Sequence, residues 1–116
     1  MNYSKKNLKS LNIKELVDYI KIKYHTIFDY RDIYHLFYFL NGFLMAKIQL
    51  QKSEEIDNYF QKYFSTWMSE KFQNQIDHST SWVKIIDKLY SEEEAVDKFF
   101  VFFDDFIKEF DASTIR

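Results

Sequence analysis

The chain has 116 residues, of which 47% are apolar, 21% aromatic and 29% charged, with one glycine, no proline and no cysteine. A single glycine excludes the phosphate-binding loops that are built from several glycines. The absence of cysteine excludes thiol nucleophiles, thiolate zinc sites and disulfides. The length, together with the lack of repeats and linker-like segments, predicts one domain over residues 1–116.

Helical periodicity runs through the whole chain, and it predicts five helices. The first helix is expected over about residues 13–27, after a capping box formed by Asn12 and Glu15. The second is expected from about Asp32 to Leu50. Its apolar residues are spread over most of its circumference, which predicts a central helix buried on nearly all sides.

The remaining three helices are predicted from their capping residues and apolar stripes. Ser53 is expected to cap the third helix, and Ser79 or Ser81 a short fourth helix that runs through Leu89. Ser91 and the glutamate three residues later have capping-box spacing, and the fifth helix should end near residue 111. The predicted fold is therefore all-α, a compact single-domain bundle of about five helices, with residues 1–11 as a flexible basic tail.

Charge is distributed unevenly, although the formal net charge is only −2. Residues 1–24 have a net charge of +4, whereas residues 91–116 have a net charge of −5. A nucleic-acid-binding protein is expected to carry a concentrated basic surface, so we expect no nucleic-acid partner.

The longest apolar stretch, residues 33–46, is shorter than the ~20 residues of a membrane span. No secretory signal is recognised, and we expect a cytoplasmic protein that does not enter a membrane.

Few residue combinations could support catalysis or metal binding. Asp32 and His35 have the spacing of a helical metal site, but such a site needs further inward carboxylates, which the predicted inner faces do not offer. Asp77, His78 and Ser79 have the residue types of a hydrolase triad, but neighbours in the chain cannot form its hydrogen-bond relay. We therefore expect no catalytic residue, no cofactor and no metal site, and we expect that the protein is not an enzyme.

The only glycine, Gly42, falls in the middle of the second predicted helix, where glycine costs about 1 kcal/mol relative to alanine. The expected reason is a close contact with another helix or with a large aromatic side chain.

The fifth predicted helix carries several acidic residues outside its apolar stripe, with Lys98 and Lys108 as the nearby positive charges. Two interpretations are open: a merely solvated helix face, or an acidic docking surface for a basic partner. The residues that would contact such a partner are Glu93, Glu94, Asp97, Asp104 and Asp105.

From the second helix onward the sequence resembles a family of small helical bacterial proteins, some of which are encoded beside polymorphic or contact-dependent growth inhibition toxins and are assigned as their immunity proteins. The resemblance lies in the order and spacing of several short motifs between residues 39 and 106. The matching residues are Phe39-Leu40-Asn41-Gly42-Phe43, Phe64, Trp67, Lys71-Phe72, His78-Ser79, Ser81-Trp82, Ile85-Ile86, Glu94-Ala95, Phe99-Phe100 and Asp104 to Phe106.

The resemblance implies a non-enzymatic protein that binds a cognate toxin, such as a basic nuclease, and occludes its active or substrate-binding surface. On this view Asn41, Trp67, His78 and Trp82 form a packed polar–aromatic cluster.

Two rival hypotheses stay open. One is a structural or adaptor protein that self-associates, as a homodimer for example, through surplus aromatic side chains. The other is an enzyme or ligand sensor with a pocket near Asn41, Gly42 and His78.

Overall fold

The computed structural model describes residues 11–28, 31–73, 75 and 80–114, and within these residues it contains five helices and no strand. The all-α fold is therefore confirmed. The helices are α1 (Ile13–Ile27), α2 (Ile33–Gln49), α3 (Glu55–Lys71), α4 (Trp82–Leu89) and α5 (Glu92–Thr114). None of them combines the length and the apolar character that a membrane-crossing helix requires.

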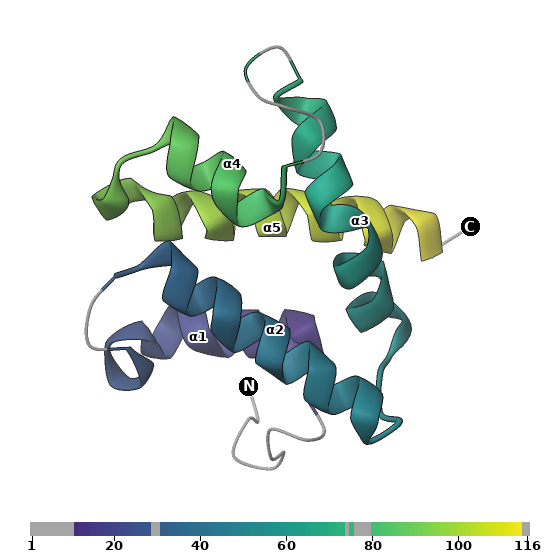
Figure 1. Ribbon diagram of the computed structural model, residues 1–116. Helices are drawn as coiled ribbons and strands as arrows, with labels where there is room; N and C mark the ends of the chain where they lie inside the picture. The colour runs from purple at the N-terminus through teal and green to yellow at the C-terminus, as the bar shows by residue number, and fades with distance from the viewer. Residues whose placement is uncertain (1–10, 29–30, 74, 76–79, 115–116) are drawn as a thin grey trace.

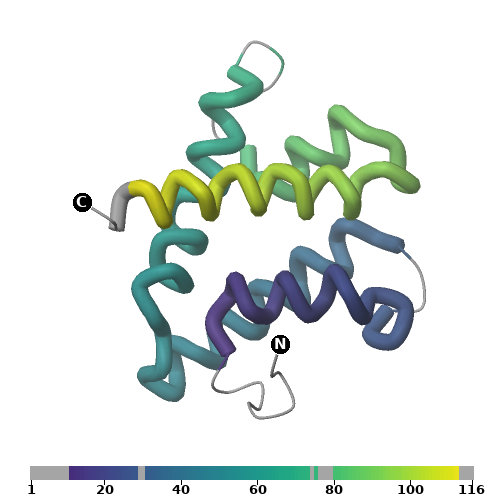
Figure 2. The backbone as a smooth tube through the Cα atoms, turned by 180° about the vertical axis from the view of Figure 1, so that it is seen from behind, coloured from purple at the N-terminus to yellow at the C-terminus, as the bar shows by residue number. Residues whose placement is uncertain are grey.

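α4 and α5 lie above α1 and α2 in Figure 1, and α3 stands at one end of both layers. α3 packs against α1, α4 and α5, whereas α2 packs against α4 and α5, and α1 packs against α3 and α5. α2 is nearest the viewer in Figure 1, whereas α1 and α5 are nearest in the reverse view of Figure 2. The outward sides of α2 and α5 therefore belong to opposite sides of the bundle.

The interior is largely aromatic where α3, α4 and α5 meet. Phe64 lies within 4.9–6.4 Å, ring centre to ring centre, of six other aromatic side chains from these three helices, mostly edge to face. Those six are Phe60, Trp67, Trp82, Phe99, Phe103 and Phe106. Burying each large apolar side chain contributes about 1.5–3 kcal/mol, and edge-to-face ring contacts add to this. These aromatics stabilise the fold and are not available as partner-binding anchors, apart from the half-buried Trp67.

The predicted capping box of α1 is confirmed, and α2 begins next to its predicted start. Asn12 and Glu15 form a reciprocal capping box at α1, because each side chain accepts a hydrogen bond from the other residue's backbone N–H, at 2.9 and 3.1 Å. The Asp32 carboxylate accepts from the backbone N–H of Tyr34 and His35 at the start of α2. These caps satisfy N–H groups that have no partner within the helix.

Other predicted caps are wrong or different in kind. Glu54, not Ser53, is the N-cap of α3, and its capping-box partner is Asp57. Ser81 is the N-cap of α4, but its side chain makes no capping bond. Instead, the hydroxyl of Ser65 on α3 accepts a hydrogen bond from the backbone N–H of Trp82 at 3.1 Å. A cap supplied by a distant helix cannot be read from local sequence.

The Asp57 carboxylate joins the beginnings of two helices. It is 1% exposed, and its two oxygens accept from the backbone N–H of Ile13 at 2.7 Å and of Glu54 at 2.8 Å. The ammonium of Lys47, near the end of α2 and 3% exposed, lies 3.9 Å from one of these oxygens. We call this arrangement the Asp57 clamp. It brings α1, α2 and α3 together at one point in the interior.

The prediction that α2 is central and buried on nearly all sides is wrong. Its fully buried residues are Ile33, Leu36, Leu40, Leu44 and Lys47, and they lie along one side. Gly42 is on the exposed side, and a Cβ built there would have no neighbouring atom within 4 Å. The expected contact at Gly42 within the fold is therefore absent among the described residues.

The two ends of the bundle also differ from the prediction. Leu11, assigned to the flexible tail, is buried in the core, whereas residues 1–10 lie outside the described part of the chain. α5 continues to Thr114, beyond the predicted end near residue 111. The inward stripe of α5 is as predicted except that Phe102 is also buried and Phe110 is half-buried.

Replacing Asp57 with alanine should lower the free energy of unfolding by about 3–5 kcal/mol, because it leaves the buried Lys47 ammonium and two helix-start N–H groups without their carboxylate. Asp18→Ala is the matched control, since Asp18 pairs with Lys14 at 3.5 Å in a partly exposed position. That pair should contribute less than about 0.5 kcal/mol. Urea unfolding measures both variants, and equal losses would contradict the role assigned to the clamp.

Gly42→Ala should raise the free energy of unfolding by about 1 kcal/mol, because alanine favours the helix and the added methyl group meets open space. The measurement is urea unfolding followed by circular dichroism at low protein concentration. A lower free energy of unfolding for Gly42→Ala would contradict this expectation, because it would mean that other atoms lie close to Gly42.

Candidate protein-binding surface

Five acidic side chains share the solvent-facing side of α5. Glu93, Glu94, Asp97, Asp104 and Asp105 are all exposed. At 100° per residue, their positions fall within about one third of the circumference of the helix. We call this surface the acidic face. These five residues are the partner contacts predicted from the sequence, and the fold brings all five onto one surface.

An exposed apolar residue sits in the middle of the acidic face. Val101 is 54% exposed, and it is one turn from both Asp97 and Asp104 on the same side of the helix. Interfaces commonly combine an apolar centre with a polar, charged rim. The arrangement of Val101 and its acidic neighbours has this form on a small scale.

Basic side chains partly neutralise the acidic face. Arg31, from the segment before α2, donates a 2.7 Å hydrogen bond to Asp97, and Lys108 lies 3.3 Å from Asp104. Lys98, expected from sequence to relieve the negative charge, lies instead with its ammonium 5.1 Å from the centre of the Tyr90 ring. Among the described residues, Glu93 and Asp105 have no ion pair. The face keeps an excess of negative charge.

Arg31 connects the acidic face to the interior. Its guanidinium lies 5.0 Å from the centre of the Tyr24 ring, and the Tyr24 hydroxyl accepts a hydrogen bond from the backbone N–H of Asp32 at 3.3 Å. Burial raises the pKa of Tyr24 above its ordinary value. Sequence reasoning missed Arg31 because 66 residues separate it from Asp97, and no local pattern indicates the pair.

The start of α5 also gives its glutamates a structural role. The Ser91 hydroxyl donates a 2.9 Å hydrogen bond to the Glu94 carboxylate, and α5 begins at Glu92. Negative charge in the first turn is favoured by the positive end of the helix dipole. Glu93 and Glu94 therefore stabilise α5 while also contributing to its exposed negative charge.

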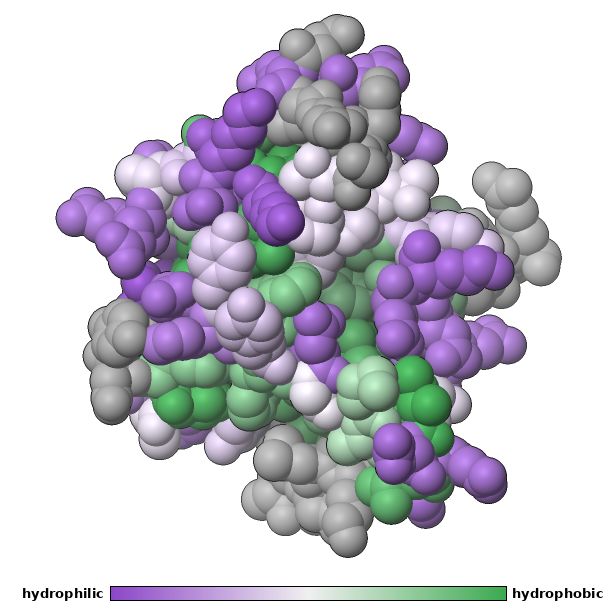
Figure 3. All heavy atoms as spheres, viewed as in Figure 1, coloured by the Kyte–Doolittle hydropathy of each residue, from purple (hydrophilic) through white to green (hydrophobic). Residues whose placement is uncertain are grey.

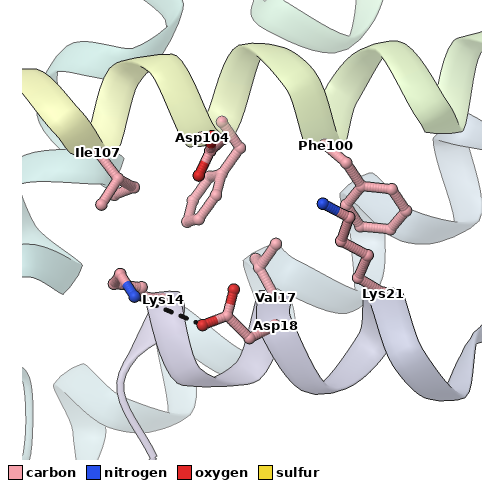
Figure 4. A pocket seen from close by; sticks show the side chains of 8 residues that line it. Lys14, Val17, Asp18, Lys21, Phe100, Asp104 and Ile107 are labelled. Atoms are coloured by element: carbon pink, nitrogen blue, oxygen red, sulfur yellow. Dashed lines mark hydrogen bonds and ion pairs between the residues drawn. The ribbon is translucent and has the colours of Figure 1, made fainter.

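On one edge, the acidic face borders α1 (Figure 4). A small pocket lies in this seam, with Val17 from α1 and Phe100 and Ile107 from α5 among its apolar lining residues. Charged side chains of both signs surround it: Lys14, Asp18 and Lys21 from α1, and Asp104 from α5. Lys14 and Lys21 of α1 therefore bound the acidic face on this side.

On the other edge, the acidic face borders aromatic side chains of α3. The Trp67 indole N–H donates a short hydrogen bond to the Glu109 carboxylate of α5, and the Tyr59 ring stacks on Phe106 with ring centres 4.8 Å apart. Burial, followed by the nearby Glu109 charge, raises the pKa of Tyr59. Tyr63, next along α3, is exposed. We call Tyr59, Tyr63 and Trp67 the aromatic shelf.

The other candidate sites are not assembled in the described part of the chain. Asp32 caps α2 and lies 4.0 Å from His35, and no group of three or more potential metal ligands occurs among the described residues. The Asp77–Ser79 segment lies outside those residues. The expected packed cluster of Asn41, Trp67, His78 and Trp82 is wrong for Asn41, which is exposed, while Trp82 is buried, Trp67 is half-buried and His78 is not described.

Comparisons with protein-family models, with curated proteins and with solved structures give no match to this chain.

Arg31→Gln should lower the free energy of unfolding by only about 1 kcal/mol or less, because Asp97 is largely exposed and solvent screens the pair. Asp97→Asn should have a similarly small effect, and a double-mutant cycle gives the energy of the pair. Chemical unfolding measures all three variants. A coupling energy above about 2 kcal/mol would mean that Asp97 serves the fold and is not free for a partner.

Proposed function

We propose that this chain is a non-enzymatic immunity protein that acts in the cytoplasm. It binds a cognate bacterial toxin domain and neutralises it by covering the toxin's active or substrate-binding surface. The observation that carries the proposal is the acidic face of α5, where five exposed carboxylates surround an exposed apolar residue. The resemblance of residues 39–106 to immunity proteins supplies the class of partner.

Charge favours a basic partner. Negative side chains on one face speed the encounter with a positively charged surface and disfavour acidic partners. A toxin that cleaves nucleic acid binds a polyanionic substrate, so its substrate-binding surface is expected to be positive. The acidic face of α5 would occupy that surface in place of phosphate groups. A basic nuclease is therefore the toxin that we propose as the partner.

The neighbouring surfaces suit such a complex. The aromatic shelf borders the acidic face through the Trp67–Glu109 hydrogen bond and offers partly exposed rings beside carboxylates. Aromatic side chains are enriched among residues that dominate binding energy, and arginine packs favourably on their faces. Val101, Tyr63 and Trp67 are the apolar contacts that we assign to the interface, while Asp97 and Asp105 provide charge.

The product of the adjacent gene, if it is a toxin, should co-purify with this protein and lose toxicity when the two are co-expressed. Asp105→Lys should weaken the complex at least tenfold, because it reverses a charge that has no ion-pair partner in the described structure. The dissociation constant is measured by calorimetry, and protection is measured as growth of cells that express the toxin.

Asp87→Lys is the control, since it makes the same charge change at an exposed position on α4, outside the acidic face. It also removes the 3.2 Å hydrogen bond that the Asp87 carboxylate accepts from the Tyr34 hydroxyl, so circular dichroism must first show that both variants are folded. Asp87→Lys should bind and protect like the unmodified protein. If no complex forms and co-expression gives no protection, the proposed function is wrong. If the complex forms but both substitutions weaken it equally, the function stands and the assignment of the acidic face is wrong.

A further inference from the structure

The outward side of α2 is apolar and is covered by nothing in the described structure. Tyr38 is 66% exposed, Met45 52% and Ile48 44%. With the exposed Asn41 and Gly42 they form one surface, which we call the α2 face. Figure 3 looks onto this side, and pale and green spheres predominate along α2 while hydrophilic purple spheres gather to either side. Large apolar side chains at helical spacing on one exposed side are typical of an interaction surface.

Gly42 gives a second, independent reason to expect a close neighbour on this side. Glycine in the interior of a helix costs about 1 kcal/mol relative to alanine. The fold itself makes no use of the missing side chain, since a Cβ at Gly42 would touch no neighbouring atom. Ala46, also exposed, follows one turn later, so the two small residues leave a shallow strip beside the line of Tyr38 and Met45. Such a strip allows the backbone of another helix to approach closely.

The lack of charged side chains on the α2 face indicates which kind of partner it can bind. The exposed residues of α2 include no lysine, arginine, aspartate or glutamate, because the only such residue in the helix is the buried Lys47. In contrast, the described parts of α1, α3, α4 and α5 all expose charged residues. A two-fold symmetric interface places each surface against its own copy, so like charges would meet like. An uncharged apolar surface can pair with itself, whereas the acidic face of α5 would repel itself.

We propose that the α2 faces of two copies of this chain pack against each other around Gly42 to form a symmetric dimer. α2 has 17 residues and is therefore about 25 Å long. One helix pair supplies an interface at the lower end of the size range of specific complexes, below about 1,200 Å². The dimer is consequently weak and reversible. Because α5 lies on the opposite side of the bundle, pairing leaves the acidic face open, and the dimer does not depend on the proposed function (Figures 1 and 2).

Sedimentation velocity and light scattering of the full chain over a concentration series test the dimer. The mass should approach twice the 14.3 kDa of one chain at about 100 μM and fall to that of one chain on dilution. Met45→Glu should give a monomer at every concentration, because it brings two like charges into the interface. Val101→Glu, made at a residue of nearly equal exposure on α5, should still dimerise.

Gly42→Gln separates loss of pairing from loss of folding. Glutamine favours the helix over glycine, and its side chain enters open space in the single chain, so thermal stability should not fall. The same side chain would fill the strip that the second copy needs, so this variant should be monomeric. A chain that is monomeric up to about 1 mM, or dimerisation that survives both Met45→Glu and Gly42→Gln, would overturn the proposal. Equal loss of dimer in Val101→Glu would also overturn it.

Discussion

The position of Asp57 ties together the half of the bundle that contains α1, α2 and α3. A carboxylate buried without partners would be strongly destabilising. Here its oxygens accept from the first N–H of α1 and from the N-cap of α3, and a buried lysine near the end of α2 lies beside them. Both helix starts are the positive ends of helix dipoles, which further favours the negative charge. One ionised side chain thus holds the three helices together at this point.

The other half of the bundle depends on aromatic packing. α3 takes part in both, because its first turn provides Asp57 and its later turns provide Phe60, Phe64 and Trp67 for contact with α4 and α5. The inward stripe of α5 is fully used in this core. The ion pairs of Asp97 and Asp104 on its outward side contribute little to folding, since both pairs are exposed. The proposed partner would therefore contact side chains on which the core does not depend.

The helices could be predicted from sequence where local chemistry defines them. Asn12 with Glu15, and Asp32 before α2, are caps that act within three residues of themselves, and the α5 stripe is a regular helical pattern. The environment of α2 could not be predicted, because its many aromatic residues suggest burial on all sides while the bundle covers only one. The buried charges of Lys47 and Asp57 and the pairing of Arg31 with Asp97 were missed for a related reason. They depend on contacts between segments far apart in the chain, which residue spacing does not encode.

We propose that the outward charge of α5 serves a partner and acts through long-range attraction. The association rate constant of this protein with its cognate toxin, measured by stopped flow at increasing salt, tests this directly. We expect the association rate to fall at least tenfold between about 50 and 500 mM salt, because screening removes the attraction between an acidic and a basic surface. An association rate that does not change with salt would contradict it.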